Sequence, residues 1–213
     1  MIKETREHKD RDTVDTITYE YNEDWKLIKT YLTTKTIKKY LQSSYEYSNE
    51  GTVETRTDYS ETGEITDKTV TEYDDRGNKI SSKKYTKENS LTQEIYYTYD
   101  VFEKEVDGKV EQIYVLSRLE YVYGTEKFIS KYIIDEKNMR IAISRDIFGC
   151  PDAEYIYNSS GQLVKTEIWD LRGKTSKFNQ YHYDSQGNQT EMLYYKEEGD
   201  LRYIIKYEYQ KKE

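Results

Sequence analysis

The chain has 213 residues and is acidic, with 41 Asp and Glu against 33 Lys and Arg and a formal net charge of −8. This balance lacks the basic footprint of a nucleic-acid-binding protein, and no run of about 18 apolar residues predicts a membrane-spanning helix. Two histidines and a single cysteine, Cys150, exclude an intramolecular disulfide and offer no metal-ligating cluster, so no cofactor is expected.

The composition instead predicts an unusual kind of β-sheet. Charged residues make up 35% of the chain and hydrophobic residues only 35%, but there are 25 tyrosines. A tyrosine ring can bury a large apolar face while its hydroxyl stays in contact with water. We therefore expect a thin sheet held together by tyrosine rings, without a thick aliphatic core.

Residues 1–14 are almost all polar or charged, and they predict either a polar N-terminal arm or a weak first strand. They contain no apolar stretch typical of a secretion signal. The sequence predicts a cytoplasmic protein if Met1 is the native start, and an exported or cell-surface protein if a leader has been removed. Residues 15–213 are expected to form one continuous domain, because no linker rich in Pro, Gly or Ser interrupts them.

A short repeating unit runs through most of this domain. Each unit has an aromatic residue, then a small polar residue that begins a turn, and a glycine four positions after the aromatic residue. The aromatic residues are spaced by 12, 14, 12 and 14 residues in two separate stretches: Tyr47, Tyr59, Tyr73, Tyr85 and Tyr99, and Tyr157, Trp169, Tyr183, Tyr195 and Tyr209. Turns at this interval, separated by residues that favour strands, predict an all-β antiparallel meander of hairpins with a 26-residue period. Such a single sheet is expected to twist or curl, with closure into a spiral or barrel-like form as one outcome.

The tyrosines are expected to lie on one face of this sheet. Residues two apart on a strand share a face, and the motif Tyr-x-Tyr recurs along the chain, as in Tyr19-Glu20-Tyr21 and Tyr181-His182-Tyr183. The tyrosine face has two interpretations at this point. It is either the core of the sheet or an exposed platform for a ligand.

The repeat is irregular in residues 100–154, which we treat as an insertion. A lengthened loop is expected from Asp100, with a hairpin tip at residues 107–108 and a long apolar strand over residues 109–123. Residues 135–138 and 146–149 resemble the usual turns without their aromatic residue. The only proline, Pro151, is expected at a turn, a bulge or a sheet edge.

No residues are assigned a catalytic or metal-binding role, and the chain is expected not to be an enzyme. Turn aspartates such as Asp74, Asp100, Asp170 and Asp184 each supply one carboxylate, whereas Ca²⁺ takes about six to eight oxygens, so they predict turn capping. An enzyme with its site in residues 100–151 is retained as a minor alternative. The candidate binding residues are aromatic: Tyr157, Trp169, Tyr183, Tyr195, Tyr123 and Phe148.

The segments Tyr73-Asp74-Asp75-Arg76-Gly77-Asn78 and Tyr183-Asp184-Ser185-Gln186-Gly187-Asn188 resemble the Tyr-Asp (YD, or Rhs-type) repeats of bacterial surface and toxin proteins. The resemblance covers most of residues 19–209, and a looser one exists to MORN-like repeats. It implies an antiparallel sheet wound in a spiral, which serves as a scaffold or as a protein- or carbohydrate-binding surface. The chain is short compared with the large toxin shells, and it lacks their Asp-Pro autocleavage motif.

The sequence therefore predicts a non-enzymatic repeat protein that binds another protein, with an immunity or antitoxin role as one specific form. The partner is expected to be basic because the chain is acidic. The alternative is a surface carbohydrate-binding module that uses exposed aromatic residues to stack against a glycan.

Overall fold

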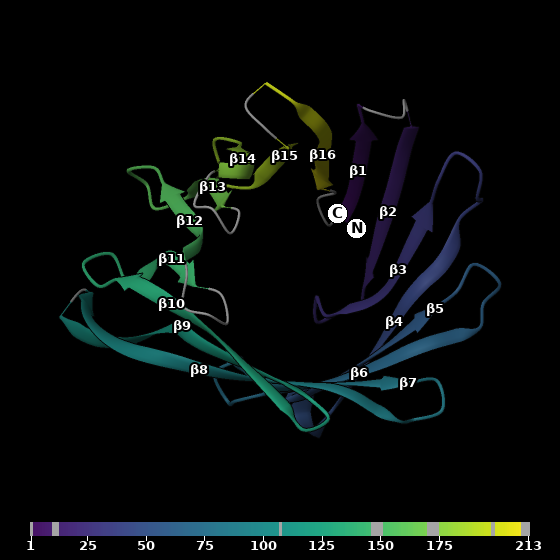
Figure 1. The fold of residues 1–213 in the computed structure, drawn as a ribbon, viewed down its shortest axis with the longest axis horizontal. Coiled ribbons are helices and arrows are strands. Elements are labelled where there is room, and N and C mark those ends of the chain that lie inside the picture. Colours follow the sequence, from purple (N-terminus) through teal and green to yellow (C-terminus); the bar gives the residue numbers. More distant parts are fainter. Residues whose placement is uncertain are drawn as a thin grey trace.

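The computed structural model describes residues 2–9, 13–106, 108–145, 151–169, 175–196 and 199–209. In these residues sixteen strands form one antiparallel sheet, and strands that are consecutive in the chain are neighbours in the sheet. The first strand, β1 (Ile2–His8), also pairs with the last, β16 (Leu201–Tyr209), and this pairing closes the sheet into a barrel (Figure 1). The prediction of an all-β meander that closes into a barrel-like form is confirmed.

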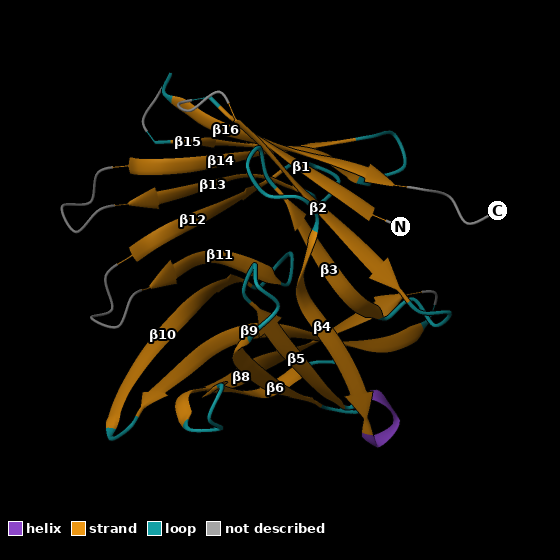
Figure 2. Ribbon diagram, turned by 90° about the vertical axis from the view of Figure 1, so that its right-hand side faces the viewer, coloured by secondary structure: helices purple, strands orange, loops and turns teal. Residues whose placement is uncertain are grey.

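The remaining strands follow one another around the wall of the barrel (Figure 2). They are β2 (Thr13–Tyr21), β3 (Leu27–Thr33), β4 (Tyr40–Ser48), β5 (Val53–Tyr59), β6 (Ile65–Tyr73), β7 (Lys79–Thr86), β8 (Leu91–Val106), β9 (Lys109–Tyr123), β10 (Glu126–Asp135), β11 (Arg140–Arg145), β12 (Pro151–Tyr157), β13 (Leu163–Trp169), β14 (Thr175–Tyr183) and β15 (Gln189–Tyr195). A short 3₁₀ helix, η1 (Asn49–Gly51), connects β4 and β5.

The N-terminal segment is a strand of the barrel. Of the two expectations for residues 1–14, the polar arm is wrong for residues 2–8, because β1 pairs with β2 on one side and with β16 on the other. Without β1, the backbone N–H and C=O groups along β2 and β16 would form two open sheet edges. Its backbone pairing therefore explains why so polar a segment is a regular strand.

The turns have the geometry that the repeat predicts. Gly77 and Gly187 have positive φ values of 85° and 86°, and Trp25 and Asn89 adopt φ values of 60° and 62° at the equivalent position of their own units. The Asp184 carboxylate accepts hydrogen bonds from the backbone N–H groups of residues 186 and 188, both at 2.9 Å. Asp74 caps its turn in the same way, so the expected capping role is confirmed at these two aspartates.

The irregular region is more regular than the sequence predicts. Asp100 pairs with Val115 inside the β8–β9 hairpin, so the lengthened loop expected from Asp100 is wrong. The reason is local: Val101 and Phe102 favour an extended chain, and their strand continues to the hairpin tip. The long strand over residues 109–123 is confirmed as β9.

The turn predicted after Asp135 and the position predicted for Pro151 can be compared with the structure. A turn follows Asp135, as expected, and Pro151 is the first residue of β12, where a register shift opposite Arg145 produces a bulge. The expected turn at residues 146–149 and the turn aspartate Asp170 lie outside the described residues.

Strand register confirms that the tyrosines share one face. Residues opposite one another across the ladder point the same way, as Tyr19, Thr30 and Ser43 do on β2, β3 and β4. We call this side of the sheet the tyrosine face; it carries Tyr19, Tyr45, Tyr97, Tyr121, Tyr155, Tyr181 and Tyr207. The other side, the outer face, carries alternating acidic, basic and Thr side chains such as Glu20 and Lys29.

The tyrosine face also supplies most of the core. Among the described residues, only Val115, Leu119, Ala153 and Ile205 are buried hydrophobic side chains. Small polar side chains on the same face are buried as well, including Thr30, Ser43, Ser144 and Thr166. Strand register places tyrosines beside small residues, as with Tyr19 and Thr30 or Tyr155 and Thr166, so the core is built from rings and hydroxyls.

The tyrosine face is the inner, concave face of the barrel. Burial raises the pKa of Tyr121 on β9, and the Tyr123 hydroxyl and the Asp152 carboxylate on β12 raise it further. Side chains converge on the concave side of a curved single-layer sheet, so the side that carries most of the buried residues is the inner one. Concave crowding also explains how Ser43 is only 1% exposed in a single-layer sheet.

Candidate binding site

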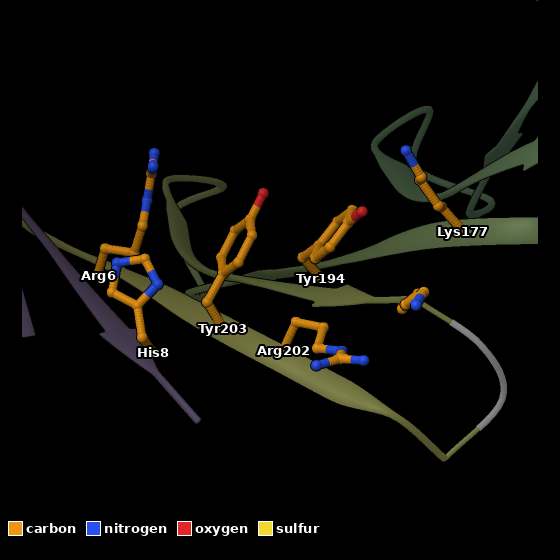
Figure 3. Close-up of a pocket in the computed structure, with 7 residues that line it drawn as sticks. Arg6, His8, Lys177, Tyr194, Arg202 and Tyr203 are labelled. Atoms are coloured by element: carbon orange, nitrogen blue, oxygen red, sulfur yellow. The ribbon is translucent and has the colours of Figure 1, made fainter. Parts of the chain in front are cut away.

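A basic pocket opens at the rim of the barrel where β15 ends and β16 begins (Figure 3). Its volume is about 520 Å³, and its lining side chains are Arg6, His8, Lys177, Tyr194, Lys196, Arg202 and Tyr203. Five of these seven side chains can carry a positive charge and none is acidic. We call this site the basic pocket.

Barrel closure brings these side chains together. His8 on β1 lies opposite Tyr203 on β16, Tyr203 lies opposite Tyr194 on β15, and Tyr194 lies opposite Asn179 on β14. Arg6 and Lys177 lie two residues from His8 and Asn179, so they project from the same face of the sheet. The pocket therefore lies on the tyrosine face and needs residues from both ends of the chain.

A stacked aromatic pair forms the centre of the pocket. The rings of Tyr194 and Tyr203 are parallel within 14° and their centroids are 4.6 Å apart. The Arg6 guanidinium lies 5.2 Å from the centroid of Tyr203, and the His8 ring lies 6.0 Å from it. The far side of Tyr203 is thus occupied, while Tyr194 lies between Tyr203 and Lys177 (Figure 3).

Three of the five basic side chains have an acidic partner beside the pocket. The Arg6 guanidinium lies 3.4 Å from Glu4, His8 Nε2 lies 3.0 Å from Asp15, and the Arg202 guanidinium lies 3.0 Å from Asp200. In the part of the chain that the structure describes, neither Lys177 nor Lys196 forms an ion pair. These two ammonium groups therefore give the pocket its excess positive charge.

The pocket also offers neutral hydrogen-bonding groups. Burial raises the pKa of Tyr203, and the nearby Arg6 only partly opposes this, so the hydroxyl is a donor at neutral pH. Arg6 Nε and, beside the pocket, Asn179 Oδ1 are buried without a hydrogen-bond partner among the described residues. Unsatisfied buried polar atoms are uncommon in folded proteins, and ordered water or a ligand is the usual explanation.

A second pocket of about 360 Å³ lies at the opposite rim, between β4, β6 and their turns. Its space is partly occupied by the protein itself, because the Lys26 ammonium lies 5.0 Å from the Tyr47 centroid and fills the room next to Gly51. A Cβ atom at Gly51 would clash with that ammonium. We therefore regard the basic pocket as the better candidate site.

Neither pocket takes a lining residue from the described parts of residues 100–151, where the enzyme alternative places its site. Among the described residues, no group of three or more His, Cys, Asp or Glu is placed to hold a metal ion. The described chain also has no helix whose length and apolar character would let it cross a membrane.

The structure does not bring the sequence-predicted binding residues together. Tyr157 and Tyr183 lie at the rim opposite the basic pocket and donate their hydroxyls to backbone carbonyls. Tyr123, which is 44% exposed, ends β9, and Trp169 ends β13. Tyr195 stacks on Phe178 on the outer face, with ring centroids 4.4 Å apart. Phe148 lies outside the described residues.

None of the seven residues that line the basic pocket is among the binding residues predicted from the sequence. Tyr194 and Tyr203 are not part of Tyr-x-Tyr units, and Arg6 and His8 lie in the segment expected to be an arm. The signal that points to the site is the closure of the barrel, since only the pairing of β1 with β16 places His8 against Tyr203.

Crystal structures of two porin-like proteins are similar to this chain over almost their whole length. The protein from Bacteroides uniformis has 12% sequence identity and a TM-score of 0.50, and the alignment covers 98% of this chain and 96% of that one. The protein from Bacteroides vulgatus also has 12% identity, with a TM-score of 0.52 and coverage of 98% and 97%. No family model matches the sequence, and no curated protein matches it. At this identity the likeness shows the fold, an antiparallel β-barrel made from a single sheet.

Proposed function

We propose that this chain is a non-enzymatic, exported β-barrel that binds carbohydrate in the basic pocket. The observation that supports it most is the stacked pair of Tyr194 and Tyr203 within a ring of hydrogen-bond donors. Sugar rings present flat C–H faces that pack on aromatic rings, and their hydroxyls pair with amino, guanidinium and phenol groups. A pocket of about 520 Å³ also has the size of small-molecule sites.

This proposal keeps the carbohydrate alternative of the sequence analysis but moves it to other residues. The stacking platform becomes Tyr194, and Tyr157 and Tyr183 take structural roles because their hydroxyls are used inside the sheet. An exported location is supported by the fold that the chain shares with the two porin-like proteins. Kinship with YD repeats remains part of the proposal, and the Asp-capped turns at Asp74 and Asp184 support it.

A protein-binding role is the second candidate, in line with the first prediction from the sequence. The β8–β9 hairpin continues beyond the pairs that connect it to β7 and β10, and in this projecting part Val101 is 49% exposed and Val110 is 66% exposed. Exposed apolar side chains on one hairpin are suited to contact with another protein. An immunity or antitoxin role would be a specific form of this second candidate.

The test of the proposed function is a glycan array followed by calorimetric titration with the hits. We expect binding by the full-length chain, loss of binding in Tyr194→Ala, and unchanged binding in Tyr123→Ala, whose ring is exposed elsewhere in the barrel. Circular dichroism checks that both variants fold. An array without hits, or equal binding by the two variants, would contradict the proposal.

A further inference from the structure

We propose that the basic pocket selects a carboxylated sugar, such as a uronic acid at the end of an acidic glycan. The inference rests on the proposed function and adds the chemical class of the ligand. It comes from the charge inside the pocket, which is opposite to the charge of the whole protein.

The positive charge of the pocket is confined to the residues that line it. The chain has a net charge of −8, but the seven described residues that line the basic pocket include five cationic or potentially cationic side chains and no carboxylate. Glu4, Asp15 and Asp200 are the acidic partners of Arg6, His8 and Arg202. The excess charge therefore resides on Lys177 and Lys196, which belong to different strands or their ends and line one pocket.

The aromatic pair leaves one position for a ligand ring. Tyr203 packs against Tyr194 on one side and is covered by Arg6 and His8 on the other. Tyr194 stands between Tyr203 and Lys177 (Figure 3), so its second ring face is directed toward Lys177. A sugar ring stacked on that face would bring a carboxylate within reach of the ammonium groups of Lys177 and Lys196.

The surroundings of the pocket favour a carboxylate at the end of a short glycan. Lysine acts as a compact point charge that can pair with a single anionic group, and the Arg6 guanidinium is already held by Glu4 and Tyr203. The acidic residues around the pocket and the net negative charge oppose the approach of a long phosphodiester chain. A short glycan end places its charge inside the pocket, where the two lysines lie.

The test compares two tetrasaccharides that differ only in charge. Tetragalacturonate and its fully methyl-esterified form are titrated into the full-length chain by calorimetry, at low and at physiological salt. We expect the acid to bind about 10-fold or more tightly than the ester, and its affinity to fall as salt is added. The double variant Lys177→Gln/Lys196→Gln should lose this preference but still bind the ester.

A matched control replaces two exposed lysines elsewhere in the sheet. Lys79→Gln/Lys131→Gln removes the same net charge and should keep the preference for the acid. Equal affinity for acid and ester would overturn the inference while leaving carbohydrate binding intact. If neither tetrasaccharide and no glycan on the array binds, the proposed function is overturned as well. Tighter binding of inorganic phosphate or of an oligothymidylate than of tetragalacturonate would assign the pocket to phosphate and overturn the inference.

Discussion

The hydroxyl of Tyr183 donates a hydrogen bond of 2.8 Å to the backbone carbonyl oxygen of Leu163, which lies twenty residues earlier on the neighbouring strand. The same relationship recurs between Tyr47 and the carbonyl of Leu27, and between Tyr209 and the carbonyl of Gln189. In each case the second tyrosine of a Tyr-x-Tyr unit connects its strand to the first residue of the preceding strand. These hydroxyls are structural parts of the repeat.

Replacement of Tyr183 by Phe tests this role. The change removes one hydroxyl and leaves the carbonyl of Leu163 without this donor, so we expect the free energy of unfolding to fall by about 0.5–1.5 kcal/mol. Tyr195→Phe is the matched control, because the structure describes no hydrogen bond from the Tyr195 hydroxyl and its ring stack on Phe178 is kept. Urea unfolding followed by circular dichroism measures both variants. Equal destabilisation of the two would contradict the role assigned to Tyr183.

Gly187→Ala should destabilise the barrel through backbone conformation alone. Gly187 has a φ of +86°, and a Cβ atom there would meet only the Gln162 side chain at 3.5 Å, an ordinary contact distance. We therefore expect a loss of about 1–2 kcal/mol from the left-handed conformation, without a steric clash. The opposite exchange, Asn89→Gly, should cost little, because Asn89 already holds a φ of 62°. Thermal unfolding of the Gly187→Ala and Asn89→Gly variants tests whether the positive φ explains why glycine occurs at this position of the repeat.

Stability should fall steeply at alkaline pH. Burial, with smaller effects from neighbouring hydroxyls and carboxylates, raises the pKa of Tyr73, Tyr132 and Tyr207 to about 12 each. The unfolded chain ionises tyrosine near pH 10. Between these values the unfolded state has lost protons that the folded state retains, so this contribution to stability is complete below about pH 10 and disappears as the pH rises toward 12.

The measurement is a titration of tyrosinate absorbance alongside circular dichroism. We expect part of the tyrosine absorbance to change together with unfolding, above the pH at which free tyrosine ionises. Complete ionisation near pH 10 with the fold intact would show that the rings are not buried as the structure describes.

Deletion of residues 1–8 should open the barrel. The deletion removes β1, which pairs with both β2 and β16, and leaves the backbone groups of two strands unpaired. Exposed edge strands pair readily with other chains, so we expect association in analytical ultracentrifugation. A polar arm that made no structural contribution could be removed without this effect, and a stable monomer after the deletion would favour that view.

Much of the fold could be predicted from local sequence. The unit around Asp184 and Gly187 predicts its own turn, and the interval from Tyr183 to Tyr195 fixes the length of the hairpin arm. The motif Tyr-x-Tyr predicts that one face carries the rings, because side chains alternate along a strand. These features depend on residues close together in the chain, and the structure agrees with them.

The closure and the binding site could not be predicted in this way. The partners of Arg6 and His8 on β16 are almost two hundred residues away, and no repeat period links them. Asp100 illustrates a different failure of local prediction. A polar residue that is typical of turns continues a strand here, because pairing with Val115 satisfies its backbone hydrogen bonds. The closure was decided by pairing between the two ends of the chain, which local spacing does not encode, whereas the strand through Asp100 was decided by pairing within its own hairpin.

A disulfide across the closing strands tests the central claim most directly. Thr5 and Lys206 are register partners on β1 and β16, and such partners have Cα atoms about 4.5–5.5 Å apart, within the range that a disulfide needs. In a Cys150→Ser background, Thr5→Cys with Lys206→Cys should form an intramolecular disulfide in a monomer, whereas Thr5→Cys with Lys83→Cys on β7 should not. Mass spectrometry after mild oxidation that found no intramolecular disulfide in the first pair, or found it only between molecules, would contradict a barrel closed by β1 and β16.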